Sequence, residues 1–448
     1  MIVKMSEDVK LLVSLFLPFF LIHSVQQIYL TYAILLYQGY GFSYETTGWI
    51  IGIYSLAAML TRPVGGWLLE NYGVRNILVW SGILSFIGCS LFFSTESATL
   101  FLIGRGFSAV AFGSYFVEPA TLLLVGRALS GAAFGIYSMG LFSHQALCVS
   151  EKRRGAMFSL LVVGSILPMG IVAPFGEWLL HGSRNVFYLA IGPVLSLFCI
   201  YFGGRVNVKV KQEGAASSLS PYERSPEMLS GGNSDEGDDD ITTGHAGQKN
   251  LGPASSKWGT YGTLFSSRSF LFLIVTGAAI ALVDSLTITL SLLTVERGIM
   301  VSLFFASVSV TALVVRLPCA SFLNGLPRVP LLAPCGILMA FSMAMIALVP
   351  SNVVLVVGGI LFGAGLGAGW PMYQALISDL LKPVLRPKGT AIALLIYDVG
   401  FFITPLLIGY LLPRFGTSAT FAAIALTAGA VLALLEMFHW LPLYRKPR

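Results

Sequence analysis

Two acidic side chains lie in apolar stretches where a carboxylate is costly. Asp284 lies about 15 residues into an apolar run over 269–294, and Asp398 lies about ten residues into a run over 389–412. At about 1.5 Å of rise per residue, both fall near the middle of a hydrocarbon layer roughly 30 Å thick. A carboxyl group in hydrocarbon favours its neutral form, so it can bind and release a proton as its access to water changes. We therefore predict that both residues bind protons; direct contact with a substrate, or a structural hydrogen bond to a neighbouring helix, is the alternative.

Arg127 is a basic residue in a similar apolar setting. Gly131 and Gly135 follow it at intervals of four residues, which places all three on one face of a helix. Small residues on that face predict close packing against another helix. Because a guanidinium facing lipid is costly, we predict that Arg127 faces a cavity, where it binds an anionic group or tunes the carboxylates. Extension of the side chain to the outer membrane interface is the alternative.

Further polar side chains accompany these three charges. The first apolar run contains His23, Gln26 and Gln27, and His23 lies four residues before Gln27 on the same helix face. His23 can relay protons or form a hydrogen bond between helices. Glu177 lies toward the outer end of its apolar run, where we expect water to reach it. Tyr137 offers an aromatic surface for a substrate, although aromatic residues also serve as packing.

The elements that position these residues are predicted to be membrane-spanning helices. Of 448 residues, 56% are hydrophobic and 11% are charged, against about 25% charged in a soluble chain. The mean hydropathy is +0.81. Long continuous apolar runs favour helices over the short alternating strands of a membrane barrel. Thirteen runs are found, near 11–37, 46–69, 76–94, 98–117, 119–147, 156–180, 185–204, 269–294, 301–323, 330–349, 353–380, 389–412 and 417–441.

The chain is predicted to consist of two halves joined by a linker. Residues 205–268 are rich in Ser, Gly and acidic residues, which is typical of a disordered segment. This segment separates an N-terminal half, 1–204, from a C-terminal half, 269–448. The halves repeat each other: Arg62-Pro63 matches Arg316-Leu317-Pro318 at an offset of 254, Gly131 matches Gly363 at 232, and Gly155 matches Gly389 at 234.

The fall in offset from 254 to 232 indicates that the first half contains 22 additional residues. They are explained by a duplication, because ATLFLIGRGFSAVAFG (98–113) and ATLLLVGRALSGAAFG (120–135) are near copies displaced by 22. We therefore predict twelve crossings, six in each half, with the second copy as the fourth span. The first copy, near 98–117 and containing Arg105, is predicted to be an outer-leaflet, interfacial or re-entrant element.

The distribution of basic residues predicts the orientation. Of the 27 Lys and Arg residues, Arg184, Arg297 and Arg414 would lie outside, and Arg105 and Arg127 belong to the two copies, which leaves 22 in cytoplasmic segments. Basic residues concentrate on the cytoplasmic side of membrane proteins. We expect both termini in the cytoplasm.

The loop between the second and third spans contains a recognisable pattern. It reads Arg62-Pro63-Val64-Gly65-Gly66-Trp67-Leu68-Leu69-Glu70-Asn71-Tyr72-Gly73-Val74-Arg75-Asn76. This loop resembles the G-x-L-x-D-R-x-G-R-R signature of the major facilitator superfamily, with Glu70 in place of Asp, and with Asn71 and Asn76 at basic positions. The glycines permit a tight turn and close helix approach, and Glu70 can latch the halves on the cytoplasmic side.

The resemblance implies a major-facilitator fold, all α-helical, in which two six-helix halves rock about a central cavity. Arg127 with its glycines, and Asp398 in Tyr397-Asp398-Val399-Gly400, are similar to elements of drug-efflux members. The G-P-x-x-G-G signature expected of antiporters in the fifth span is degraded to Ala173-Pro174-Phe175-Gly176-Glu177. The residues implied in gating the inside are Arg62, Gly66, Glu70, Gly73, Arg75 and Arg316.

The predicted function is proton-coupled export of a small organic molecule across the bacterial inner or plasma membrane. A proton-coupled symporter or facilitator for a nutrient, such as an amino acid, carboxylate or sugar, is the first alternative, and a sensor or scaffold without flux is the second. The five cysteines show no paired metal-ligand spacing, and no catalytic or nucleotide-binding motif is found. We expect a monomer in the lipid bilayer that binds substrate and protons, with no enzyme activity, cofactor, metal or nucleic-acid partner.

Overall fold

The regular structure of the described residues is entirely helical. The computed structural model describes the chain except for residues 1–6, 94–118, 149–150, 183, 207–263, 323–327, 382–384 and 446–448. In chain order the elements are α1 (Glu7–Gln27), η1 (Ile28–Thr31), α2 (Tyr32–Ile34), η2 (Leu35–Gly39), α3 (Tyr44–Phe93), α5 (Pro119–Cys148), α6 (Glu151–His181), α7 (Asn185–Gly203), α9 (Arg268–Glu296), α10 (Ser302–Phe322), α11 (Leu332–Leu348), α12 (Asn352–Leu380), α13 (Arg386–Phe415), α14 (Thr417–Leu435), η6 (Glu436–Trp440) and α15 (Leu441–Arg445).

Within the described residues, the structure has twelve long helices at the positions predicted for the spans, which confirms that prediction for this part of the chain. Nine described segments are long and apolar enough to cross a membrane, and the apolar helices Ser302–Arg316 and Leu332–Leu348 are shorter. The twelfth is the first part of α3, which consists of two helices that meet at Gly73. Gly73 has φ of +73° and ψ of 157°, a conformation that favours glycine because it has no Cβ. The tight turn predicted for this loop glycine is therefore confirmed.

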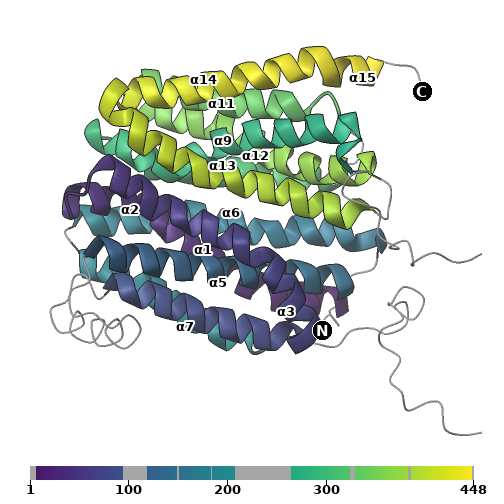
Figure 1. Ribbon diagram of the computed structural model, residues 1–448, viewed down its shortest axis with the longest axis horizontal. Coiled ribbons are helices and arrows are strands. Elements are labelled where there is room, and N and C mark those ends of the chain that lie inside the picture. Colours follow the sequence, from purple (N-terminus) through teal and green to yellow (C-terminus); the bar gives the residue numbers. More distant parts are fainter. Residues whose placement is uncertain are drawn as a thin grey trace, which may run out of the picture.

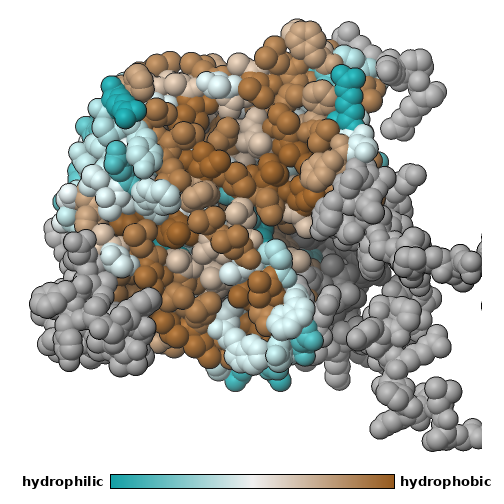
Figure 2. Space-filling view, in the orientation of Figure 1, coloured by the Kyte–Doolittle hydropathy of each residue, from teal (hydrophilic) through white to brown (hydrophobic). Residues whose placement is uncertain are grey.

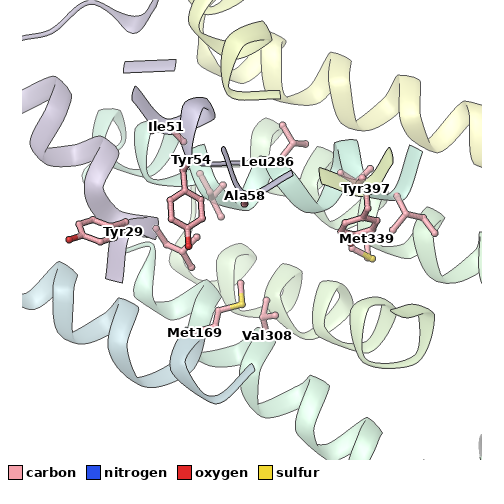
Figure 3. Close-up of a cluster of buried hydrophobic side chains, with 14 of the residues drawn as sticks. Tyr29, Ile51, Tyr54, Ala58, Met169, Leu286, Val308, Met339 and Tyr397 are labelled. Carbon is pink, nitrogen blue, oxygen red and sulfur yellow. The ribbon is translucent and has the colours of Figure 1, made fainter. Parts of the chain in front are cut away.

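The two sequence halves form two groups of helices that pack side by side. In Figure 1, α1 to α7 form the lower group and α9 to α15 the upper group, and the start of α1 lies at the same end of the bundle as α15. Between the groups, α3 packs along α13 and α6 packs against α10. Figure 3 shows Met169 of α6 beside Val308 of α10. The domain boundaries at 204 and 268 stay predictions.

Glycines allow α3 and α13 to approach closely. A Cβ added at Gly48 of α3 would lie 2.5 Å from the carbonyl oxygen of Pro405, and one added at Gly409 of α13 would lie 2.7 Å from that of Tyr44. Neither contact is compatible with a larger residue unless the backbones separate. The close contact between the halves along these two helices therefore depends on both glycines.

The outer surface is apolar, as a bilayer requires. Figure 2 shows hydrophobic side chains over the middle of the visible face and polar ones mainly toward its edges. Large apolar side chains such as Phe438, Val353 and Phe187 are about two-thirds or more exposed. Polar residues, including Arg127, Glu177 and Arg316, are buried inside. This distribution suits a chain whose solvent is lipid, where polar groups must be satisfied internally.

The duplication can be followed only in part. Its second copy lies within α5, as predicted for the fourth span. The first copy, near 98–117 with Arg105, and the linker segment 207–263 lie outside the described residues. The role of the first copy stays a prediction.

Candidate functional site

A cavity of about 230 Å³ lies between the two halves. It brings together residues far apart in the sequence, from both halves, and most of its wall is apolar or aromatic. Two Arg, two Asp and one His side chain interrupt that wall. The lining residues are Phe19, His23, Gln26, Gln27, Leu30, Tyr54, Ser55, Ala58, Arg62, Phe134, Ser138, Phe142, Val162, Ser165, Ile166, Met169, Asp284, Thr287, Ile288, Arg316, Leu366, Trp370, Leu394, Tyr397, Asp398 and Phe401.

Asp398 forms an ion pair with Arg62 across the two halves. Nη2 of Arg62, on α3, donates to Oδ1 of Asp398, on α13, over 3.1 Å, and Nε lies 3.0 Å from Oδ2. The side chains are 22% and 14% exposed, so the pair is only partly screened by water. The sequence suggested both residues but not their pairing, because they are 336 positions apart. The structure thus places Arg62, predicted as a gating residue, in the cavity wall.

Asp284 is held by a tyrosine of its own half. The hydroxyl of Tyr397, on α13, donates to Oδ2 of Asp284, on α9, over 2.6 Å. The Tyr397 ring is itself fixed by Trp370 and Phe401, with ring centroids 4.6 and 5.5 Å away. Tyr397 precedes Asp398 directly, so one turn of α13 carries Asp398 and, through Tyr397, binds Asp284. Sequence reasoning cited Tyr397 only as part of a motif and missed its contact with Asp284.

Arg316 lies in the cavity wall with weaker partners than Arg62. It is on α10 and 3% exposed. Its Nε donates to the carbonyl of Gly367 over 3.2 Å and its Nη2 to that of Leu366 over 3.5 Å. Its Nη1 is buried and finds no hydrogen-bond partner among the described residues. Asp284 is close enough to interact electrostatically with this guanidinium.

The predicted polar face of the first span lines the same cavity. Nδ1 of His23 lies 2.8 Å from the carbonyl oxygen of Phe19, one turn earlier on α1. The His23 ring also contacts the rings of Phe19 and Phe134, with centroids 4.1 and 5.1 Å away. Gln26 and Gln27 complete this face, and Oε1 of Gln27 is buried without a partner in the described part of the chain. The described hydrogen bond of His23 is thus within its own helix.

Arg127 lies behind the cavity wall, inside the N-terminal half. It is 4% exposed and stacks on Tyr29 and Tyr54, with its guanidinium carbon 5.1 and 4.5 Å from the ring centroids. Figure 3 shows the two tyrosines on one side of the cluster of buried side chains. Tyr54, not Arg127, is among the described lining residues. Contact with a substrate stays a prediction, and such contact would require Tyr54 to move.

The close packing predicted for the glycines after Arg127 is confirmed. A Cβ added at Gly131 would clash with the backbone of Tyr54, and one added at Gly135 would lie 2.5 Å from the carbonyl oxygen of Ala58. Both contacts are with α3. The guanidinium is thus held next to a tight contact between α5 and α3.

Glu177 is not hydrated as expected. Its side chain, near the end of α6, is 2% exposed. Its Oε1 accepts from the backbone N–H of Val301 over 2.9 Å, and its Oε2 accepts from that of Ser302 over 2.7 Å. Ser302 is the first residue of α10, so the carboxylate caps a helix of the other half and satisfies two free donors. The expectation of a wet side chain was wrong because the start of α10 covers it.

Tyr137 and Arg75 are not among the described residues that line the cavity. The hydroxyl of Tyr137 donates to the carbonyl of Cys199 on α7 over 3.0 Å, and its ring is buried. Arg75 is exposed. Gly66 and Glu70 belong to α3, but their side-chain surroundings lie outside the described residues. A latch through Glu70 stays a prediction.

Two helical halves that enclose a charged cavity within an apolar shell define a multi-pass membrane transporter. The family model described as Major Facilitator Superfamily matches residues 15–317 and 285–448. The chain belongs to this superfamily, as the resemblance of the loop after Arg62 implied. Its family and fold are those of transporters, not of enzymes.

A solved structure shares this fold. It is the crystal structure of a POT family transporter in complex with 5-aminolevulinic acid, which is 14% identical with a TM-score of 0.67. The match covers 97% of this chain and 96% of that one. At this identity the likeness shows the fold alone. A search of the curated proteins found no match.

Proposed function

We propose that this protein is a secondary active transporter that couples proton movement to the export of a small organic molecule by alternating access. The observation that carries the proposal is the ion pair between Arg62 and Asp398. It joins the two halves inside the cavity, through helices that must shift against each other when access changes sides. A group that titrates at this position connects proton binding to the movement of the halves.

The coupling follows from the charge on Asp398. When ionised, the carboxylate holds α13 to α3 through one charge-assisted hydrogen bond and a second close contact between opposite charges. When Asp398 binds a proton, this attraction is lost and the guanidinium of Arg62 becomes available to another group. Breaking a buried pair costs about 3–5 kcal/mol, and partial exposure here reduces that figure. A few kcal/mol is enough to shift a two-state equilibrium by orders of magnitude.

Asp284 provides a second site for a proton or a cationic group. Its hydrogen bond from Tyr397 connects it to the same turn of α13 that contains Asp398. A change of charge at Asp284 therefore alters a hydrogen bond to α13, the helix that carries Asp398. His23, Gln26 and Gln27 face the same space and can orient a substrate.

Export is the preferred direction, because Arg127 with its glycines and Asp398 resemble elements of efflux members. Uptake of a nutrient with protons is the second candidate. It is favoured by the mixed charges of the cavity, which suit a polar solute, and by the fold shared with a transporter solved in complex with 5-aminolevulinic acid. In either case we place both termini in the cytoplasm of a cell whose inner or plasma membrane holds the protein.

Flux in proteoliposomes under an imposed pH gradient tests the proposal. A panel of small acids, amines and amides is supplied, and internal pH is followed with a fluorescent dye. Export predicts solute movement opposite to the proton, and uptake predicts movement with it. Asp398→Asn and Asp284→Asn should lose uphill accumulation but keep exchange of solute at equal pH, because exchange needs no net proton transfer.

The matched control is Asp379→Asn, which removes an exposed carboxylate that pairs with Arg328 outside the cavity lining. It should transport like the parent. If both cavity variants accumulate solute like the parent, the proton role of these aspartates is refuted. If no compound moves and internal pH is unaffected, the proposed transport is refuted and the function as a sensor or scaffold is favoured.

A further inference from the structure

Arg62 and Arg316 occupy equivalent positions in the two halves but have different partners. The offset of 254 residues relates them in the sequence, and both line the central cavity. Arg62 pairs with the carboxylate of Asp398 through two of its nitrogens. Arg316 contacts two backbone carbonyls at 3.2 and 3.5 Å and pairs with no carboxylate in the described residues. The repeat has thus kept both cations but only one anionic partner.

The sequence explains why Arg316 lacks that partner. The offset of 234 that aligns Gly155 with Gly389 places Gly164 opposite Asp398. Glycine has no side chain to offer a guanidinium. The adjacent Ser165 lines the cavity, but its hydroxyl donates to the carbonyl of Val162 over 2.7 Å.

The burial of the Arg316 charge costs free energy unless a further ligand binds it. A guanidinium has five N–H donors, and the only acceptors found for Arg316 in the described part of the chain are two backbone carbonyls, at 3.2 and 3.5 Å. Burial of a charge without an ionic partner is strongly unfavourable. Asp284 offsets part of this cost electrostatically, but its Oδ2 already accepts from Tyr397. A ligand that brings its own anionic group to Arg316 would complete the site.

The geometry of the site indicates the kind of anion. The planar fork of Arg matches the two oxygens of a carboxylate. In the same cavity lining, Trp370, Tyr397 and Phe401 form an aromatic wall that suits an apolar body. We infer that the substrate is a small organic anion, a carboxylate on an apolar body, and that Arg316 binds its carboxylate. This inference rests on the proposed transport function and specifies its substrate class.

Binding to the purified protein tests the inference without any flux. Shifts in melting temperature are titrated with three matched triplets: benzoate, benzamide and benzylammonium; hexanoate, hexanamide and hexylammonium; and the acid, amide and amine of an indole-methyl body. The acids should stabilise the parent, and the amides and amines should not. This comparison within the parent protein does not depend on how any variant folds.

Substitutions then locate the anion. Arg316→Gln should weaken acid binding by about tenfold or more, since a charge-assisted hydrogen bond contributes about 1.5–3 kcal/mol. Arg316→Lys keeps the charge but not the fork, and should retain part of the binding. The control Arg414→Gln removes an exposed Arg at the end of α13 and should bind acids like the parent. Melting temperature and size exclusion without ligand verify that each variant is folded.

Three results would overturn the inference: amides or amines that bind as well as the acids, acid binding that survives Arg316→Gln, or an absence of binding by all three acids. Proton-coupled flux of an amine in the liposome assay would leave the proposed transport intact while removing this role of Arg316. Conversely, acid binding that depends on Arg316 in a protein without proton-coupled flux would keep the anion site and remove the proposed transport.

Discussion

Replacing Glu177 by Gln should shift the protein toward a conformation open at the end of the bundle that holds this residue. The Glu177 carboxylate of α6 accepts from the backbone N–H groups of Val301 and Ser302, at the start of α10, and so connects the two halves. Gln keeps one acceptor oxygen, loses one charge-assisted bond and loses the favourable interaction with the helix dipole. These losses are about 1.5–3 kcal/mol and about 0.3–1 kcal/mol respectively. Because Glu177 is 2% exposed, water does not compensate in this closed state.

The resulting change in population is large enough to measure. A loss of about 2 kcal/mol corresponds to roughly a 30-fold shift between the closed and open states. Other contacts resist it, because the hydroxyl of Tyr44 donates to Glu296 of the other half over 3.0 Å. That contact is exposed, so water replaces much of the roughly 1.5–3 kcal/mol of a charge-assisted hydrogen bond when it breaks. The hydrogen bonds of Glu177 should therefore contribute more than the Tyr44–Glu296 contact to holding this end of the bundle closed.

Distances between spin labels test this prediction. Nitroxides at Arg184→Cys and Met300→Cys, both exposed positions in opposite halves at this end, are introduced into a cysteine-free background. Glu177→Gln should broaden the distribution toward longer distances. Glu45→Gln, an exposed carboxylate in the first turn of α3, is the control and should leave the distribution as in the parent. If the distribution for Glu177→Gln coincides with that of the control, the carboxylate does not hold this end closed.

Three further tests, each by substitution, concern the packing, the turn in α3 and the ion pair. Gly131→Ala should lower the free energy of unfolding by about 1–3 kcal/mol, because the added Cβ would clash with the backbone of α3. The control is Gly140→Ala, whose added Cβ has its nearest neighbour 3.6 Å away and should raise the free energy of unfolding by about 0.5–1 kcal/mol. Equal melting temperatures of the two variants would contradict this prediction. Gly73→Ala should cost about 1–3 kcal/mol, again by thermal unfolding, because its φ of +73° suits only glycine. Arg62→Asp should abolish uphill flux, and the exchanged pair Arg62→Asp with Asp398→Arg should restore part of it; a double variant as inactive as the single one would refute the pairing.

The sequence predicted the elements well because the bilayer imposes strict conditions on them. A helix that crosses lipid must be apolar for most of its length, so the runs within the described residues correspond to α1 through α14. The turn inside α3 was predictable because Gly73 lies in a loop with a family pattern. The 3-10 and π segments that follow α1 were not, because no Pro or Gly marks where the helix changes its winding.

The positions of charged residues were more predictable than their partners. Asp284 and Asp398, predicted near the middle of the bilayer, line the cavity, which keeps their carboxylates away from lipid. Glu177 was misjudged because its surroundings come from α10 of the other half. Tyr137 contacts α7 instead of a substrate space because a single sequence does not reveal which face of an apolar helix meets which neighbour.

The repeat and its exceptions give different kinds of information. Features that recur at matching offsets, such as the glycines near 131 and 363, serve packing that both halves need. The Arg that recurs in both halves lines the cavity in each of them, and an anion stabilises a guanidinium that is withdrawn from water. The chain supplies one for Arg62 through Asp398, and Gly164 withholds it from Arg316. Both Arg residues line the cavity, but only Arg62 is paired with a carboxylate of the chain. Arg316 is therefore the one that is left to bind an anionic solute. Specificity for a solute therefore arises where the two halves stop resembling each other, and those positions can be found by aligning the chain with itself.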